Sequence, residues 1–496
     1  DRLRSRGLGD VYKRQDYAYA FGVNEFVLCA SAYQPWIDKY PGSTAGGKHY
    51  CLNRNNTYWE YSRPFWDYQA RCSALMRKGV PVVDICVYLG QNPPVKLVTY
   101  RLPEIPEGYD FDVCTAEALV GRTMAVDGRL TLPTGISYSL LVIQRNNDMP
   151  LHVLRHIAGL VKGGVIVCGP RPDGSDSLKD KAESEEYRAL VDELWGELTT
   201  VSQIRKVGKG KIYENIPLSE VLKYENIRPD IAIKSGNTAK DKVYFVHRRL
   251  SDADVYFLNN HSDRAFHDTI RLRTDARQAE YWDAVTGQRY MIPVKASGEK
   301  GMLLNLTLAP RESGFIVTSN NQATGLLPRI ADVQETITPI EGSWNVYFDP
   351  RWGGPGKVVF DELIDWTVHA DTGIRYYSGT AVYHKELNLA MPAQNERLLL
   401  RFPRLGSLAR VWVNGKEVVT VWCSPWEADI TSYVHEGKNN LKIEVVNSLM
   451  NRMIGDASLP ESERFTYAYP QIATPTDKLV PSGIMEQLNL VYRQCQ

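Results

Sequence analysis

Polar and aromatic side chains suited to holding sugars are concentrated in two short stretches near the start of the chain. One is Tyr33-Gln-Pro-Trp36 and the other is Asn53-Arg-Asn-Asn-Thr-Tyr-Trp-Glu-Tyr61. Planar amide and guanidinium groups hold hydroxyl groups in fixed geometry, while aromatic rings cover the apolar C–H face of a sugar ring. The two stretches therefore predict a carbohydrate site lined by Tyr33, Gln34, Trp36, Arg54, Asn55, Trp59 and Glu60.

The second stretch also has a purely structural interpretation. Tyr58, Trp59 and Tyr61 are spaced as the packing residues of a helix would be, and the neighbouring asparagines could cap that helix. Glu60 either orients Arg54 or is a solvated helix residue. From the residues alone both interpretations stay open.

The elements around these stretches indicate the end of a barrel. Phe26–Ala30 is a short apolar run, typical of a strand buried on both faces in a parallel sheet. Barrel enzymes carry their chemistry in the loops that follow such strands. A helix with Phe65 and Leu75 on one face and a second buried strand at Val82–Leu89 continue the pattern. Residues 16–103 are thus predicted to be the C-terminal part of a (β/α)8 catalytic barrel.

The first fifteen residues differ in character from the rest of the chain. The segment has no initiator methionine, carries five basic residues and shows neither hydrophobic periodicity nor the apolar centre of a signal peptide. We expect residues 1–15 to be a non-native leader of the kind left by sequence assembly. The chain would then begin inside a domain.

Three further units follow the predicted barrel end. A strand at Ser139–Ile143, an apolar helix face and a strand at Val165–Cys168 form a βαβ unit of a flavodoxin-like α/β domain. Regularly spaced short strands then indicate a β-sandwich. In the last unit Asn414-Gly415, between alternating apolar residues, predicts a hairpin turn. The predicted ranges are 104–239 for the α/β domain, 240–319 for the β-sandwich and 320–496 for a C-terminal jelly roll.

Composition excludes several classes of function. The 496 residues include 58 Lys and Arg against 58 Asp and Glu, so the net charge is zero and no electrostatic footprint for nucleic acid or a membrane surface is present. No apolar run approaches the roughly 20 residues of a membrane-spanning helix. The eight cysteines form no C-x-x-C pair, and the chain has no Asp-rich calcium loop, so no metal site or cofactor is evident.

Several motifs resemble one known family. The segments GVNEFVLCASAYQPW, NRNNTYWEYSRPFWDYQARC and PVVDICVYLG are similar to the late barrel of glycoside hydrolase family 106, the α-L-rhamnosidases. YFLNN, AEYWDAVTGQ, VWVNGKEV and NRMIGD continue the match in the same order. The 104–239 unit resembles an amidotransferase-like module, and 320–496 resembles the galactose-binding-like jelly roll of glycoside hydrolase family 2. Tyr33 departs from the pattern, because the family is expected to carry histidine there.

The resemblance implies a function for the full-length parent. That protein would hydrolyse terminal α-L-rhamnosyl residues of plant or microbial glycans with inversion (EC 3.2.1.40), and its partner would be an oligo- or polysaccharide. Its acid and base glutamates are expected upstream of this chain, so the catalytic residues are unknown and the chain alone is expected to be inactive. Calcium is implied by the family only. The residues leave the compartment unknown, and the resemblance implies a periplasmic or secreted parent.

Two alternatives remain. The chain could be a non-catalytic carbohydrate-binding assembly whose main site lies in the jelly roll. It could also belong to another glycosidase, such as a β-galactosidase-like enzyme, that shares the accessory domains.

Overall fold

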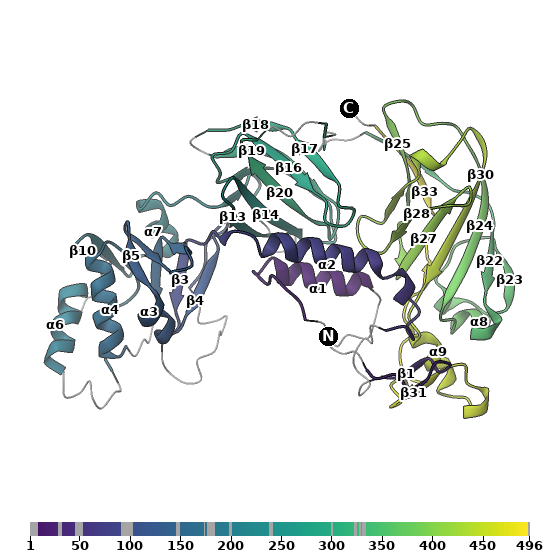
Figure 1. The fold of residues 1–496 in the computed structure, drawn as a ribbon, viewed down its shortest axis with the longest axis horizontal. Coiled ribbons are helices and arrows are strands. Elements are labelled where there is room, and N and C mark those ends of the chain that lie inside the picture. The colour runs from purple at the N-terminus through teal and green to yellow at the C-terminus, as the bar shows by residue number, and fades with distance from the viewer. Residues whose placement is uncertain are drawn as a thin grey trace.

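The protein consists of an α/β domain, a central β domain and a C-terminal β domain, arranged in a row with a helix pair beneath the central domain (Figure 1). This arrangement comes from a computed structural model. It describes residues 8–27, 32–44, 53–90, 103–144, 149–172, 174–175, 184–197, 201–237, 242–298, 301–321, 325–326, 329 and 334–494, with the backbone alone at 8–13 and 184. The prediction of a multidomain protein that combines α/β and β-rich parts is confirmed.

The α/β domain is built on a six-stranded sheet of order β10-β11-β9-β8-β3-β4. All neighbouring pairs are parallel except the edge pair β10–β11. Residues 151–162, which follow β8, form helix α4 because their apolar side chains recur at helical spacing. The apolar face of α4 is buried against the sheet. The elements are β3 (Ile85–Tyr88), β4 (Phe111–Cys114), α3 (Ala116–Arg122), β5 (Met124–Val126), β6 (Arg129–Thr131), β7 (Ser137–Tyr138), β8 (Leu140–Ile143), α4 (Leu151–Lys162), β9 (Ile166–Cys168), α6 (Ser184–Trp195), β10 (Gln203–Val207), β11 (Gly210–Glu214) and α7 (Leu218–Tyr224).

Strand β3 corrects the predicted barrel end. The run Val82–Leu89 does contain a strand whose four residues are all buried, but β3 pairs with β4 on one side and β8 on the other. It therefore belongs to the α/β domain, and the predicted boundary at 103 is wrong. A continuous apolar run encodes burial on both faces and is compatible with any parallel sheet.

The described residues of 16–90 do not form a barrel with one another. Their strands β1 (Pro41–Ser43), β2 (Val80–Pro81) and β3 pair with three different parts of the chain. Of the strand predicted at Phe26–Ala30, Phe26 and Val27 are not in a strand and Val27 is 94% exposed. The remaining residues of that prediction lie outside the described ranges.

The central β domain packs two antiparallel sheets face to face. Their orders are β17-β16-β20-β14-β13-β2 and β12-β15-β19-β18. Apolar residues alternate along β19 because its inner face enters the shared core and its outer face does not. The strands are β12 (Ile231–Ile233), β13 (Val243–Arg249), β14 (Ala253–Asn260), β15 (Phe266–Leu272), β16 (Gln278–Trp282), β17 (Arg289–Ile292), β18 (Val294–Ala296), β19 (Met302–Leu308) and β20 (Ser313–Ser319).

The C-terminal domain also consists mainly of two antiparallel sheets, of order β23-β22-β24-β30-β27-β28 and β21-β33-β25-β29. The predicted Asn414-Gly415 hairpin is confirmed, since it joins β27 to β28 with positive φ at both residues. The elements are β21 (Glu335–Pro339), β22 (Trp344–Phe348), β23 (Gly356–Phe360), α8 (Thr372–Arg375), β24 (Thr380–Leu389), β25 (Glu396–Arg401), β26 (Leu405–Gly406), β27 (Leu408–Val413), β28 (Lys416–Val421), β29 (Glu427–Asp429), β30 (Gly437–Val446), α9 (Met450–Asp456), β31 (Tyr467–Tyr469), β32 (Gly483–Ile484) and β33 (Asn489–Gln494).

Helices α1 (Leu8–Tyr19) and α2 (Arg63–Met76) lie side by side beneath the central domain (Figure 1). Their aromatic faces join one core with residues of β13, β14 and β20 and with Trp422 of the C-terminal domain. Gln15 is buried and accepts a 2.6 Å hydrogen bond from Gln69 Nε2. The expectation that residues 1–15 stand outside the fold is therefore corrected from Leu8 onward.

Candidate carbohydrate site on the 32–61 segment

The side chain of Gln34 holds the first predicted stretch together. Its Nε2 donates to the Ser43 carbonyl at 2.7 Å, and its Oε1 accepts from the Ser43 N–H at 2.9 Å, as a paired backbone group would. Gly42 is required opposite it, because φ is +75° and a Cβ there would lie 2.4 Å from Gln34 Oε1. Gln34 is therefore engaged in shaping the loop and is only 9% exposed.

Asn55 and Arg54 bind the second stretch to the first. Asn55 is buried, and its Nδ2 donates to the Lys39 carbonyl at 3.0 Å. Arg54 Nη2 donates to the carbonyls of Gln34 at 3.1 Å and Trp36 at 3.5 Å. The structure thus brings Gln34, Trp36, Arg54 and Asn55 into one unit. The contacts of Gln34 and Asn55 are those of positioning residues, whereas Arg54 keeps an exposed side chain.

The C-terminal domain completes this unit with Tyr467. Strand β1 pairs in parallel with β31, with Pro41 opposite Tyr467. The ring of Tyr467 meets the edge of Trp36 at a centroid distance of 5.1 Å, and Lys39 Nζ lies 4.1 Å from the Tyr467 ring centroid. Sequence reasoning missed Tyr467. The alternation Phe465-Thr-Tyr-Ala-Tyr469 is the signal that could have found it.

Trp59 and Glu60 take no part in the hydrogen bonds that join Gln34, Arg54 and Asn55. They belong to the short helix Trp59–Tyr61. The Tyr61 hydroxyl of this helix contacts Thr380 and Glu444 on the six-stranded sheet of the C-terminal domain. Arg410 stacks on Tyr61, with its guanidinium carbon 4.1 Å from the ring centroid, and donates to the Glu60 carbonyl at 3.1 Å. Burial raises the pKa of the Tyr61 hydroxyl, which therefore stays neutral. Among the described residues no ion pair joins Glu60 to Arg54, so the predicted orienting role is not observed.

Three aromatic side chains of these segments and of β31 are exposed to solvent. Tyr33 is 83% exposed, Tyr469 65% and Trp59 39%. Exposed aromatic rings, a guanidinium group and an ammonium group are the kinds of side chain that bind polyhydroxylated ligands. Within the part of the chain that the structure describes, no group of three or more His, Cys, Asp or Glu side chains is arranged to hold a metal ion.

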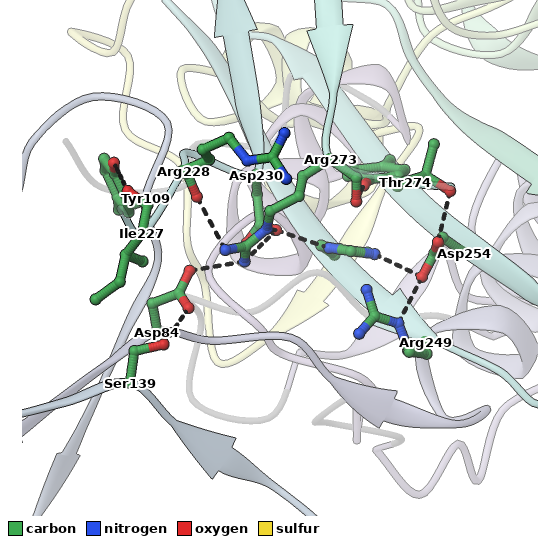
Figure 2. Close-up of polar contacts among 12 residues, drawn as sticks. Asp84, Tyr109, Ser139, Ile227, Arg228, Asp230, Arg249, Asp254, Arg273 and Thr274 are labelled. Carbon is green, nitrogen blue, oxygen red and sulfur yellow. Dashed lines mark hydrogen bonds and ion pairs between the residues drawn. The ribbon is translucent and has the colours of Figure 1, made fainter. Parts of the chain in front are cut away.

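A buried charge network joins the α/β domain to the central domain, and the sequence did not predict it. Figure 2 shows Arg273 between Asp84, 2.7 Å away, and Asp230, 2.6 Å away. The two ring nitrogens of His247 contact Asp230 and Asp254, each at 3.0 Å. We define these five residues as the Arg273 network.

The environment of Asp254 illustrates the strength of the network. Burial raises the pKa of Asp254, but hydrogen bonds from His247 and Thr274 and the charges of His247 and Arg249 outweigh it and bring the pKa to about 2. Asp84 and Asp230 are almost completely buried. Buried charges of this kind are tolerated only when they are paired. We therefore interpret the Arg273 network as an interdomain lock, by which we mean a set of buried charge pairs that stabilises the contact between the α/β domain and the central domain.

Comparison with known proteins identifies the family. The model of glycoside hydrolase family 106, described as alpha-L-rhamnosidase, matches residues 9–295, more than half of the chain. The chain belongs to glycoside hydrolase family 106. Its residues 331–492 also match the sugar binding domain of glycosyl hydrolases family 2.

Two relatives extend the comparison beyond the family 106 match. The structure of a rhamnosidase from Novosphingobium sp. PP1Y superposes with a TM-score of 0.88 at 29% identity, over 98% of this chain and 46% of that one. A putative beta-glucuronidase of Formosa agariphila is 22% identical, over 90% of this chain and 56% of the relative. This family 106 chain thus spans about half the length of the relatives it matches. No helix among its described residues has both the length and the apolar character needed to cross a membrane.

Proposed function

We propose that this family 106 chain is part of an α-L-rhamnosidase that removes terminal α-L-rhamnosyl residues from plant or microbial glycans with inversion. The observation that carries the proposal is the TM-score of 0.88 over 98% of the chain to a rhamnosidase. Inverting hydrolysis requires a general acid and a general base about 6.5–9.5 Å apart. In this proposal both lie on parts of the enzyme beyond this chain.

The 32–61 segment would supply recognition in such an enzyme. Arg54 Nη2 is held by two loop carbonyls, which leaves Nε and Nη1 without a partner among the described residues and able to donate to sugar hydroxyls. Tyr33 and Trp59 present ring faces to solvent. Gln34 and Asn55 would act through the loop that they shape. Calcium stays an implication of the family alone.

The proposed reaction is tested with a panel of nitrophenyl glycosides. The protein encoded by the full reading frame is expected to hydrolyse the α-L-rhamnoside, and NMR should show the β-anomer as the first product. Activity confined to the β-D-glucuronide or the β-D-galactoside would overturn the proposal in favour of a related glycosidase. The panel must include the β-D-glucuronide, because one relative is described as a putative beta-glucuronidase.

A second prediction concerns Tyr33. In the same protein Tyr33→Ala is expected to lower kcat/KM for the aryl rhamnoside at least about fivefold, because loss of a stacking face removes about 1 kcal/mol or more. The melting temperature should stay unchanged because the side chain is 83% exposed. Ile37→Ala is the matched control, as Ile37 is 80% exposed in the same loop. Equal kinetics for both variants would remove Tyr33 from the site.

One observation favours a second candidate function. Residues 331–492 match a sugar binding domain, which is compatible with a non-catalytic carbohydrate-binding assembly. In that case the whole panel would remain unhydrolysed while the protein retained binding to immobilised glycans. Hydrolysis of any glycoside in the panel decides against this candidate.

A further inference from the structure

The outer face of the four-stranded sheet in the central domain carries a shallow groove of about 420 Å³. Strand register places Ala232, Arg271 and Leu303 in one row across β12, β15 and β19. Lys295 lies beside this row on β18, and Lys234 follows β12. The alternate residues of these strands, such as Ile270 and Leu304, are buried in the core, so the groove residues face outward. In Figure 1 this sheet lies on the side of the domain away from α1 and α2.

The groove carries an excess of positive charge. Lys234, Arg271 and Lys295 all line it. Among the described residues, none of the three side chains forms an ion pair or a hydrogen bond, although the charge of Lys234 helps to lower the pKa of Asp268. Asp268 alternates with Thr269 and Arg271 along β15 and so is not part of the outward row. Its carboxylate accepts hydrogen bonds from the N–H groups of Ser235 and Thr269, at 2.8 and 2.6 Å. Three cations on one face repel one another, and an anion placed between them relieves that repulsion.

Neutral polar side chains continue the groove along the strands. Thr269 donates to Asn305 Oδ1 at 2.8 Å across β15 and β19, and His267 pairs with Thr307 at 2.7 Å further along. Outward positions on a strand are about 7 Å apart. The face therefore offers hydroxyl, amide and imidazole groups at regular intervals beside the cations. This combination suits a ligand that has both anionic groups and hydroxyl groups.

We propose that this face, which we call the basic groove, binds an anionic oligosaccharide whose uronate carboxylates pair with Arg271, Lys234 and Lys295. Arginine and lysine form their strongest hydrogen bonds with such groups. The chain as a whole has zero net charge, so the attraction is local to the groove and gives no general affinity for polyanions. The ligand class rests on the proposed function, because it assumes that the protein acts on a glycan. The basic groove would bind an acidic part of that glycan at a place separate from the 32–61 segment.

Binding of trigalacturonate, measured by isothermal titration calorimetry at low ionic strength, tests this proposal. The triple variant Lys234→Ala/Arg271→Ala/Lys295→Ala is expected to bind at least tenfold more weakly than the original protein. The control Lys357→Ala/Arg404→Ala/Lys416→Ala removes the same charge from exposed positions of the C-terminal domain and should bind as the original protein does. Lys295→Glu alone is a second variant, and it changes one exposed side chain only. It should weaken binding at least fivefold.

Three outcomes would overturn the proposal. The first is an equal loss of affinity in the triple variant and its control. The second is equally tight binding of the methyl ester of trigalacturonate, which lacks the charges. The third is inorganic sulfate that competes with the same affinity as the sugar, which would indicate an anion site without saccharide specificity. Because the assay measures binding, it stays decisive whether or not the protein hydrolyses a rhamnoside.

Discussion

Replacing Arg273 with methionine is expected to lower the free energy of unfolding by about 3–5 kcal/mol. Arg273 pairs with Asp84 and Asp230, whose side chains are 3% and 0% exposed. Methionine keeps most of the side-chain volume but removes the charge, so two buried carboxylates lose their closest cation. Asp84 then keeps only the longer contact to Arg129, at 3.9 Å, and Asp230 keeps only His247, at 3.0 Å, among their ion-pair partners in the described residues. Urea-induced unfolding, followed by circular dichroism, measures the loss.

Arg155→Met is the matched control for Arg273→Met. Arg155 forms an equally short pair with Glu186, but the two side chains are 45% and 47% exposed. An exposed pair contributes about 0–1 kcal/mol, so this variant should lose little. The double variant Asp84→Asn/Arg273→Met should recover part of the stability, because one of the stranded charges is gone. Similar losses for Arg273→Met and Arg155→Met would show that the Arg273 network is not an interdomain lock.

Replacing Trp422 with alanine is expected to cost about 3–5 kcal/mol and to uncouple the C-terminal domain from the helix pair. Trp422 is 2% exposed and directly follows β28. Its ring packs against Phe65 and Tyr68 of α2 at centroid distances of 5.6 and 5.8 Å. An aromatic side chain in this position carries the contact between two parts of the molecule. Differential scanning calorimetry should show an earlier, separate transition for the C-terminal domain.

Trp412→Ala provides the comparison for Trp422→Ala. Trp412 lies on β27 of the same domain, is only partly buried and has Lys442 Nζ 4.2 Å from its ring centroid. Its removal should lower stability by about 1 kcal/mol and leave the coupling between the domains unchanged. If the calorimetric profiles of the two variants match, the core around Trp422 does not hold the domains together.

Local features of the fold could be predicted because their determinants are close in the chain. Helix α4 follows from apolar residues at helical spacing, and the turn at Asn414 follows from the positive φ that Asn and Gly tolerate. The buried character of Val82–Leu89 was also apparent. The strands that pair with it could not be predicted. An apolar sequence indicates that both faces of a strand are buried, but it does not indicate which strands form hydrogen bonds with its edges.

In the candidate site, too, contacts between residues close in the chain could be predicted and contacts between distant residues could not. Gln34, Arg54 and Asn55 were grouped from residue type, and the structure brings them together through hydrogen bonds to nearby carbonyls. Tyr467 was missed because more than 400 residues separate it from Trp36, and the pairing of β1 with β31 brings them together. The catalytic carboxylates stay a prediction for parts of the enzyme beyond this chain.

The sequence by itself determined several of the elements and the burial of their faces, since these depend on residue type and short spacing. The sugar-binding role of the 32–61 segment stays a prediction from the same kind of signal. Only the tertiary structure decided that β3 joins the α/β domain, that Arg273 links Asp84 to Asp230, and that Lys234, Arg271 and Lys295 line one groove. The reason is physical. Strand pairing and charge pairing depend on distances across space, and those distances exist only after the apolar faces have packed.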